Sequence, residues 1–414
     1  MVIFVLRRTR AIKAGAARIL TKKVFWWYRM KILHILSDSN VGGAGILLEN
    51  LLRHSRLRGE SVVVLPRGAA MSERYAALGV RVLPILRMAD RSFAPADLLP
   101  LIACLRQERP MIVHTHGSLV GRLAAFFCGV PVRLATRHCA YPVGRLTRLL
   151  PLRLARRVAD GLLTTTTVAT AHAAANNLRQ LGIPAHKIVM IRNGAEGVTP
   201  LSCAIQQALR GRLGISADAF CVGICGRLVP VKGHLTFLSA ARILTAQGVN
   251  CHFLIVGGGE NEGSLREVAE RLGLTPRVTF TGYVQDPGTY MNLFDVAVNC
   301  STGTETSCLA LSEAMSLGIP CVVSRFGGNP EMVTEGENGL LFSPRDAGAL
   351  AAALGRLARD AALHARLSRG ARERFLTDCN APGMAEAYDT LYTRLTKRQT
   401  VQAHKRLRTV FSKR

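Results

Sequence analysis

Two glutamates with seven residues between them stand around the start of a helix predicted in the C-terminal half of the chain. Glu305 follows the apolar run DVAVNC and a polar turn, and Glu313 lies about two helical turns further on. A helix N-terminus offers unpaired N–H groups and a positive dipole end, which suits a phosphate. Glu305 is then placed to hold sugar hydroxyls and Glu313 to reach a ribose, as a nucleotide-sugar requires. The alternative is a helix that Glu305 caps and on which Glu313 is solvated.

Two cations follow another buried strand, in the sequence GRLVPVKG. Arg227 and Lys232 are expected in the loop that leaves the carboxyl end of this strand. Two cations in such a loop can clamp a diphosphate and neutralise its charge as it departs. Two solvated cations in a loop of a very basic protein are the alternative.

Glycines and histidines mark strand ends in the N-terminal half. Gly42 and Gly43 follow the first strand, where they let the backbone approach a phosphate or form an ordinary turn. His116 and His138 stand at the ends of later strands, where they could bind hydroxyls or move protons. His114 fits a core position equally well.

Several common signatures are missing from the sequence. The glycine runs GGAG and GGGENEG do not fit the dinucleotide pattern GxGxxG, and neither a GxSxG element nor a P-loop occurs. No DxD pair ends a strand, and no cluster of histidine, cysteine and carboxylate has metal-ligand spacing. We therefore expect neither a metal nor a cofactor.

The elements that must position these residues alternate between strand and helix. Apolar runs from KILHILS to KIVMIR predict one parallel, doubly wound sheet, and runs from FCVGICG to NGLLFS predict a second. The expected parts are a basic, aromatic extension (1–29), an N-terminal domain (30–200), a C-terminal domain (201–380) and a final helix with a basic tail (381–414). The fold class is α/β, with two Rossmann-like domains facing a cleft and a C-terminal helix that crosses back to the N-terminal domain.

The charge of the chain favours an anionic partner. The 414 residues carry a net charge of +27, and 17 of these charges come from residues 1–31 and 394–414, which contain no acid. Together with the leucine- and arginine-rich segment 142–160, they favour an acidic membrane surface, although this segment could also be a packed helix with a solvated basic face. Residues 1–29 are either an interfacial anchor or lie upstream of a true start at Met30. No segment is apolar enough to span a membrane, and the eleven scattered cysteines indicate a reducing compartment, so we expect a cytoplasmic protein on the inner face of the membrane.

Taken in order, these motifs resemble the GT-B glycosyltransferases of family 4, which are retaining nucleotide-sugar enzymes. The resemblance covers about residues 30–395 and rests on the Glu305–Glu313 pair, GRLVPVKG upstream and GIPCVVSRFGGNPE downstream. It implies that Glu305 lies by the donor sugar, Glu313 by the ribose, and Arg227 and Lys232 by the diphosphate. It places further donor contacts in the turn and helix start of the C-terminal half and in the first glycine loop, namely Thr306, Ser307, Cys308, Leu309, Gly42 and Gly43.

The resemblance also implies an acceptor side and a catalytic set. His138 would face the sugar and the acceptor, with His116 as a second candidate. Glu305, His138, Arg227 and Lys232 form the expected catalytic group, and Gly327, Gly328 and Glu331 belong to the same cleft wall. The chain departs from the family pattern at Gly45, at Cys139 and in the turn Thr306-Ser307-Cys308. The resemblance therefore does not predict which sugar the pocket binds.

The expected activity is metal-independent, retaining transfer of a sugar from a nucleotide-sugar to a hydroxyl of a lipid-linked glycan, in the synthesis of cell-surface polysaccharide or lipopolysaccharide. A GT-B nucleotide-sugar epimerase is the alternative among enzymes. A basic nucleic-acid-binding protein is the alternative from another class, but the body of the chain lacks a recognition motif for it, so no nucleic-acid partner is expected. The donor sugar, the base, the linkage and the oligomeric state cannot be predicted from the sequence.

Overall fold

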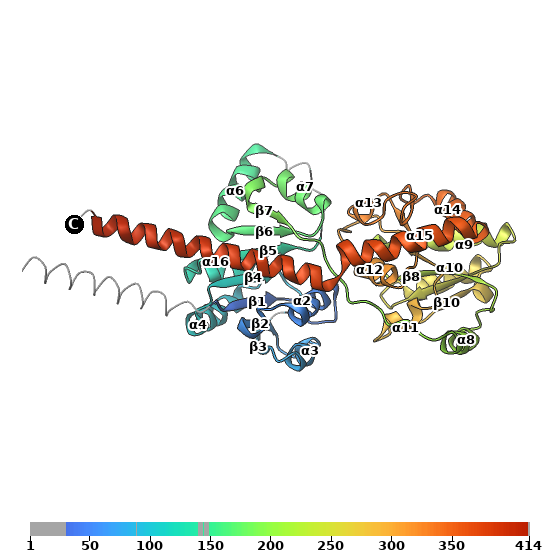
Figure 1. Cartoon of the computed structure of the whole chain (residues 1–414), viewed down its shortest axis with the longest axis horizontal. Helices are drawn as coiled ribbons and strands as arrows, with labels where there is room; N and C mark the ends of the chain where they lie inside the picture. Colours follow the sequence, from blue (N-terminus) through green and yellow to red (C-terminus); the bar gives the residue numbers. More distant parts are fainter. Residues whose placement is uncertain (1–29, 88, 140–143, 145–148, 413–414) are drawn as a thin grey trace, which may run out of the picture. The chain divides into compact units, whose positions relative to one another are not determined.

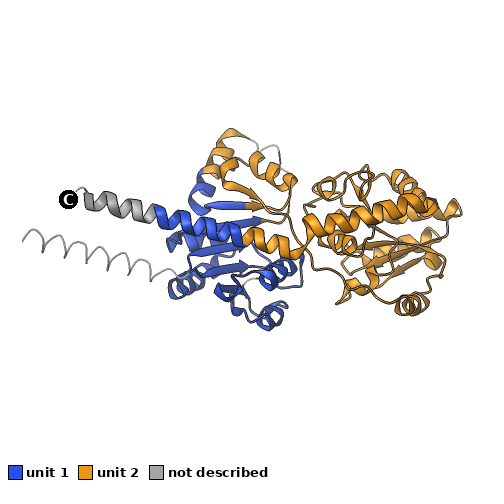
Figure 2. Ribbon diagram, in the orientation of Figure 1, with its two compact units in different colours: residues 1–136, 158–167, 389–414 blue, residues 137–157, 168–388 orange. Residues whose placement is uncertain are grey.

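The structure, a computed structural model, describes residues 30–87, 89–139, 144 and 149–412. The chain forms two compact units (Figure 2). The first contains residues 1–136, 158–167 and 389–414, and the second contains residues 137–157 and 168–388. The predicted extension 1–29 lies outside the described residues, and the predicted domain boundaries stay predictions.

The N-terminal half builds a seven-stranded parallel sheet in the order β3-β2-β1-β4-β5-β6-β7 (Figure 1). Four of its strands are buried along their whole length, as expected where helices cover a parallel sheet from two sides. The strands are β1 (Ile32–Leu36), β2 (Ser61–Pro66), β3 (Arg81–Leu86), β4 (Ile112–His116), β5 (Val132–Arg137), β6 (Thr166–Ala169) and β7 (Ile188–Met190). The helices between them are α2 (Gly43–His54), α3 (Ser72–Ala77), α4 (Leu98–Glu108), α5 (Leu119–Phe127), α6 (Leu150–Leu163) and α7 (His172–Gln180).

The C-terminal half builds a six-stranded parallel sheet in the order β10-β9-β8-β11-β12-β13. Its strands are β8 (Phe220–Cys225), β9 (Cys251–Val256), β10 (Val278–Phe280), β11 (Val296–Asn299), β12 (Cys321–Ser324) and β13 (Gly339–Phe342). The side chains of neighbouring residues in a strand point to opposite faces of the sheet. Val222 packs in the core beneath α9 (His234–Ala246), whereas Cys221 packs in the core that contains α12 (Leu309–Ser316). The predicted fold class, two doubly wound Rossmann-like sheets, is therefore confirmed.

Helices complete both faces of this second sheet. They are α8 (Cys203–Arg212), α9 (His234–Ala246), α10 (Glu262–Arg271), α11 (Pro287–Met291), α12 (Leu309–Ser316), α13 (Asn329–Met332), α14 (Ala347–Arg359) and α15 (Ala361–Arg374). In both sheets the strand order reverses beside the first strand, between β1 and β4 and between β8 and β11. Ligands of open α/β sheets bind at the carboxyl ends of strands at this switch point.

The last helix, α16 (Ala381–Ser412), returns to the N-terminal part of the chain. Asp389 accepts hydrogen bonds from the Ser55 hydroxyl (2.5 Å) and from the Arg56 N–H (2.8 Å). The Tyr392 hydroxyl lies 2.8 Å from Nδ1 of His114 on β4. These contacts confirm that the C-terminal helix crosses back to N-terminal elements.

Two further features concern the whole chain. All eleven cysteines are free thiols, and six of them are buried. Within the described ranges, every helix is too short or too polar to serve as a membrane span.

Candidate active site

The loops that follow β8 and β11 meet at the switch point of the second sheet. The loop after β8 carries Arg227 and, in a short 3-10 turn, Lys232. Gly233 adopts a φ of +73°, and a Cβ atom there would lie 2.2 Å from the Cys300 carbonyl oxygen. The Thr302 N–H, from the loop after β11, donates to the Val231 carbonyl (2.8 Å). Only a glycine at position 233 lets the two loops approach this closely.

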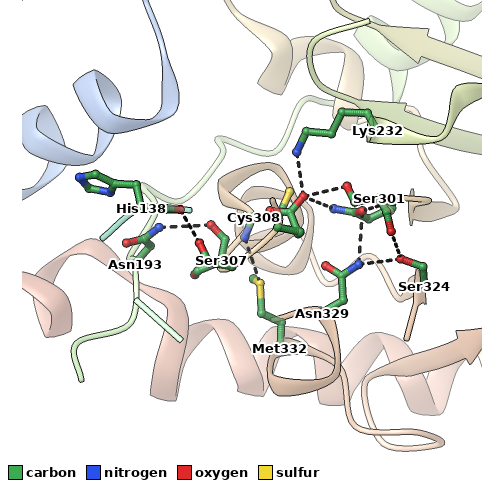
Figure 3. Close-up of polar contacts among 12 residues, drawn as sticks. His138, Asn193, Lys232, Ser301, Ser307, Cys308, Ser324, Asn329 and Met332 are labelled. Carbon is green, nitrogen blue, oxygen red and sulfur yellow. Dashed lines mark hydrogen bonds and ion pairs between the residues drawn. The ribbon is translucent and has the colours of Figure 1, made fainter. Parts of the chain in front are cut away.

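Lys232 and Glu305 form an ion pair at the junction of these loops (Figure 3). The Lys232 ammonium lies 2.7 Å from Oε2 of Glu305, whose side chain is only 7% exposed. The same oxygen accepts hydrogen bonds from the Asn299 amide (3.2 Å) and the Ser301 hydroxyl (2.9 Å). Burial opposes the ionised form of Glu305, but Lys232 and these donors outweigh it and hold the pKa of Glu305 below its usual value. Burial likewise opposes the charge of Lys232, and Glu305 outweighs it and raises the pKa of the amine.

The turn that carries Glu305 is fixed by backbone contacts that leave no space for side chains. A Cβ atom on Gly327 would lie 2.2 Å from the Glu305 carbonyl oxygen, and one on Gly328 would lie 1.6 Å from that of Thr306. The Gly328 N–H donates to the Glu305 carbonyl (3.3 Å). Thr304, a β-branched residue, has a φ of +58°, a strained conformation of the kind found at functional sites. The two glycines therefore set the position of the carboxylate without touching it.

The residues that follow Glu305 contact other segments of the second unit. The Thr306 hydroxyl donates to the His138 carbonyl (2.6 Å), and the Asn193 amide donates to the Ser307 carbonyl (3.2 Å) (Figure 3). The Cys308 N–H lies 3.2 Å from the Met332 sulfur, and Leu309 is the first residue of α12. Helix α12 thus begins four residues after Glu305, with Cys308 and not Glu305 at its N-cap.

Glu313 lies further along α12 and differs from Glu305 in its electrostatic environment. Burial, together with the nearby Asp286, raises the pKa of Glu313 to about 7. The side chain therefore titrates near neutral pH, whereas Glu305 stays ionised. The pKa values of the carboxyl group before α12 and of the one within it are thus shifted in opposite directions by their surroundings.

The remaining predicted residues are distributed over both units. Arg227 is exposed and close enough to Lys232 to oppose its charge, so the structure brings together the two predicted diphosphate ligands. Burial lowers the pKa of His138, also in the second unit, to about 4. Gly42 and Gly43, at the start of α2, and the buried His116 belong to the first unit. The roles of all these residues stay predictions.

Several polar residues of this site were missed in the sequence reasoning. Asn299 and Ser301 bind Glu305, and the amide of buried Asn329 lies 3.4 Å from the Asn299 oxygen and 3.1 Å from the Ser324 hydroxyl. Asn299 ends its strand immediately before the turn, and this position was a signal that could have identified it.

Glu331, predicted for the cleft wall, binds the start of α7. Its carboxylate accepts the N–H groups of His172 and Ala173 (2.6 and 2.8 Å).

Comparison with known proteins identifies the family. A model described as Glycosyltransferase Family 4 matches residues 41–196, and a model described as Glycosyl transferases group 1 matches residues 219–360. This chain belongs to the group 1, family 4 glycosyltransferases. The glycosyltransferase is 29% identical over 309 residues to the UDP-Gal:alpha-D-GlcNAc-diphosphoundecaprenol alpha-1,3-galactosyltransferase of Escherichia coli, a match that covers 72% of this chain and 78% of the relative. It is 23% identical to the capsular polysaccharide biosynthesis glycosyltransferase CapM of Staphylococcus aureus, over 89% of this chain and 98% of the relative.

Solved structures show the same fold. HepE of Anabaena, in complex with UDP-glucose, superposes on the glycosyltransferase with a TM-score of 0.74 at 24% identity, covering 88% of this chain and all of HepE. The sucrose-phosphate synthase of Thermosynechococcus elongatus gives a TM-score of 0.68 at 20% identity, covering 88% and 99%. The glycosyltransferase therefore has the GT-B fold, and its relatives include enzymes of capsule and lipopolysaccharide synthesis.

Proposed function

We propose that this enzyme transfers a sugar from a nucleotide-sugar to a hydroxyl group of a lipid-linked glycan, with retention of the anomeric configuration and without a metal. The observation that carries the proposal is the buried Lys232–Glu305 pair beside exposed Arg227, at the switch point of the second sheet. Cations at this place face the position where a departing diphosphate develops charge. The family of the chain supports the same chemistry.

In the proposed reaction, the bond between the anomeric carbon and the diphosphate oxygen breaks on the face where the acceptor hydroxyl attacks. Arg227, Lys232 and the N-terminus of α12 stabilise the negative charge of the leaving nucleoside diphosphate. The acceptor oxygen bonds to the anomeric carbon, and its proton passes to the departing phosphate oxygen. Glu305 is ion-paired and hydrogen-bonded. These contacts suit a role in binding sugar hydroxyls better than a role as the nucleophile.

The imidazole of His138 is assigned to the sugar and acceptor side. Because burial keeps its pKa near 4, the ring is neutral at physiological pH and can both donate and accept hydrogen bonds. His116 is the second residue proposed for this side. Gly42 and Gly43 are proposed to approach the diphosphate with their backbone.

A UDP-sugar is the first donor to test, since UDP appears in the name of the Escherichia coli relative and in the HepE complexes. The name of the same relative specifies a diphosphoundecaprenol acceptor, which supports a lipid-linked glycan here. We place the enzyme on the inner face of the cell membrane as a peripheral protein.

Helix α6 supports contact with an anionic membrane. None of its residues is buried, and five of its large apolar side chains are 46–65% exposed. Arg153 and Arg157 stand exposed between them. Exposed leucines beside arginines fit the boundary between headgroups and acyl chains.

The donor is tested by thermal shift with UDP-, GDP- and ADP-sugars, because a ligand that binds the folded state raises its melting temperature. The stabilising donor is then incubated with a diphosphoundecaprenol-linked glycan in the presence of EDTA, and the anomeric configuration of the product is read by NMR. Retained configuration and an unchanged rate support the proposal, whereas inversion, or a loss of activity with EDTA that magnesium or manganese restores, contradicts it. A donor-only incubation that changes the sugar would instead indicate an epimerase, and salt-sensitive DNA retention without donor turnover a nucleic-acid-binding protein.

Membrane binding is tested with vesicles of anionic and of neutral lipid. The wild-type protein should bind anionic vesicles at low salt and leave them at moderate salt. Leu154→Glu with Val158→Glu should bind less, and Leu235→Glu, at an exposed leucine of α9, serves as the matched control. Absence of vesicle binding by the wild-type protein at low salt would contradict the membrane assignment.

A further inference from the structure

Three histidines converge on one face of the first sheet, at its switch point. His34 on β1 pairs in register with His114 on the neighbouring strand β4, and His116 follows two residues later on β4. Because side chains alternate between the faces of a strand, His114 and His116 point to the same side. All three rings are at most 2% exposed.

The nitrogen atoms of this histidine cluster already lie near the spacing of metal ligands. Nδ1 of His34 and Nε2 of His116 are 3.4 Å apart, which is long for a hydrogen bond. Zn–N bonds of 2.0–2.1 Å place two ligands of a tetrahedral site about 3.4 Å apart, which is the same separation. One nitrogen from each of the three rings lies within 4.8 Å of the others. Modest rotations of the rings would therefore bring the three nitrogens to the separations that one ion requires.

The protonation and the surroundings of the cluster suit metal ligation. All three histidines are buried, and burial favours the neutral imidazole, which is the form that binds metals. His114 lies 2.8 Å from the Tyr392 hydroxyl through Nδ1 and 2.7 Å from the Thr136 hydroxyl through Nε2. When one of these nitrogens binds an ion, the other keeps a hydroxyl partner that orients the ring.

We propose that His34, His114 and His116 bind one zinc ion, with a fourth position for water or for a neighbouring hydroxyl. Three neutral imidazoles are a zinc ligand set, whereas Mg²⁺ prefers oxygen ligands. The ion joins β1 to β4 and, through His114 and Tyr392, the sheet to α16. Its role is structural, and the site does not rest on the proposed sugar transfer. A zinc-bound His116 serves as a ligand of this ion, which leaves the acceptor side to His138.

The experiment uses the full-length chain, stripped with a chelator and kept free of nucleotide-sugar. Equilibrium dialysis against zinc chloride, with metal analysis of the protein, should give one zinc per chain and a melting temperature raised by several degrees. Magnesium chloride should give neither. Cobalt chloride should give the intense visible absorption of a four-coordinate nitrogen site.

Variants locate the ion. His34→Ala and His116→Ala should lose the bound zinc and the thermal shift, whereas His186→Ala, at an exposed histidine, should keep both. If either alanine variant does not fold, His116→Gln and the cobalt spectrum of the wild-type chain decide the question. Sub-stoichiometric zinc, a pale six-coordinate cobalt spectrum, or zinc retained by a chain that carries both His34→Ala and His116→Ala overturns the site, whether or not sugar transfer is observed.

Discussion

The two switch points of this molecule both gather buried polar side chains between the first and fourth strands of a parallel sheet, yet their electrostatics differ. Between β8 and β11 the pair is charged, with Lys232 bound to Glu305. Between β1 and β4 the cluster contains three histidines, of which His34 is held neutral by burial. A buried charge requires a fixed countercharge, whereas neutral rings need only hydrogen-bond partners or an ion. We therefore expect substitutions at the charged site to affect both transfer and stability, and those at the histidine cluster to affect mainly stability.

The largest effect is expected from Lys232→Met. Loss of the ammonium should lower kcat/KM for transfer by about 10²- to 10³-fold, because the leaving diphosphate loses a partner. It should also lower the free energy of unfolding by roughly 3 kcal/mol, since Glu305 stays buried without its countercharge.

Steady-state kinetics and urea unfolding measure the two quantities. The double variant Lys232→Met, Glu305→Gln should regain stability without regaining activity. Arg266→Met, at an exposed ion pair on α10, should change neither. A Lys232→Met enzyme with near-normal kcat/KM would contradict the assignment of the donor site.

The next effect concerns the glycines behind Glu305. Gly328→Ala should lower the free energy of unfolding by about 3 kcal/mol, because its Cβ would overlap the Thr306 carbonyl and backbone cannot move aside cheaply. Donor binding, measured by calorimetry, should be lost with it. Gly263→Ala in α10, where a Cβ meets no atom within 4 Å, should cost nothing. Equal stability of the two variants would show that the Glu305 turn is not fixed by this contact.

Glu313→Gln tests the contrast between the two carboxylates. The folded state holds the proton on Glu313 more tightly than the unfolded state does. Below about pH 4.5 this carboxyl group is protonated in both states, so it does not lower the stability of the wild type there. The wild type loses stability as the pH rises to about 7. The amide removes this loss, and the variant should be more stable than the wild type by about 1–3 kcal/mol at pH 8 and equal to it near pH 4.5.

Melting temperatures across this pH range measure the difference, and Glu267→Gln, at an exposed position of α10, is the control. A variant that gains as much stability at pH 5 as at pH 8 would contradict the raised pKa. Donor affinity should fall in Glu313→Gln at every pH, because the amide replaces the proposed ribose ligand.

The smallest effect is expected at the histidine cluster. Tyr392→Phe removes the hydroxyl next to His114 and should lower the free energy of unfolding by about 1 kcal/mol. The kcat/KM for transfer should change less than twofold. Tyr283→Phe, at an exposed tyrosine, should leave stability unchanged. A hundredfold loss of transfer in Tyr392→Phe would remove the distinction between the two switch points.

The charged site was the more predictable of the two from sequence. Arg227, Lys232 and Glu305 each follow an apolar strand within a few residues, and parallel strands bring their carboxyl ends to one edge. The ion pair itself and the opposite pKa shifts of Glu305 and Glu313 depend on burial, which no local pattern reveals. The reason why glycine occupies positions 327 and 328 could likewise not be predicted from the sequence, since the carbonyl groups that these glycines approach belong to another turn.

The histidine cluster was beyond prediction because it depends on strand register. His34 and His116 are 82 residues apart in the chain, and only the pairing of β1 with β4 brings them together. The spacing of His114 and His116 puts both side chains on one face of a strand, but His34 is distant in the chain, and His114 fits a core position equally well. The contact of α16 with His114 adds a partner from the far end of the chain.

The close approach of Gly328 to the Thr306 carbonyl also has a genetic consequence. Every single-nucleotide change of a glycine codon that replaces the amino acid adds at least a methyl group at the α-carbon. No such replacement therefore fits at Gly328, where a Cβ would lie 1.6 Å from the carbonyl oxygen, or at Gly327, where it would lie 2.2 Å from one. Random mutagenesis should return these two positions among the inactive clones, although neither contributes a side chain to the site.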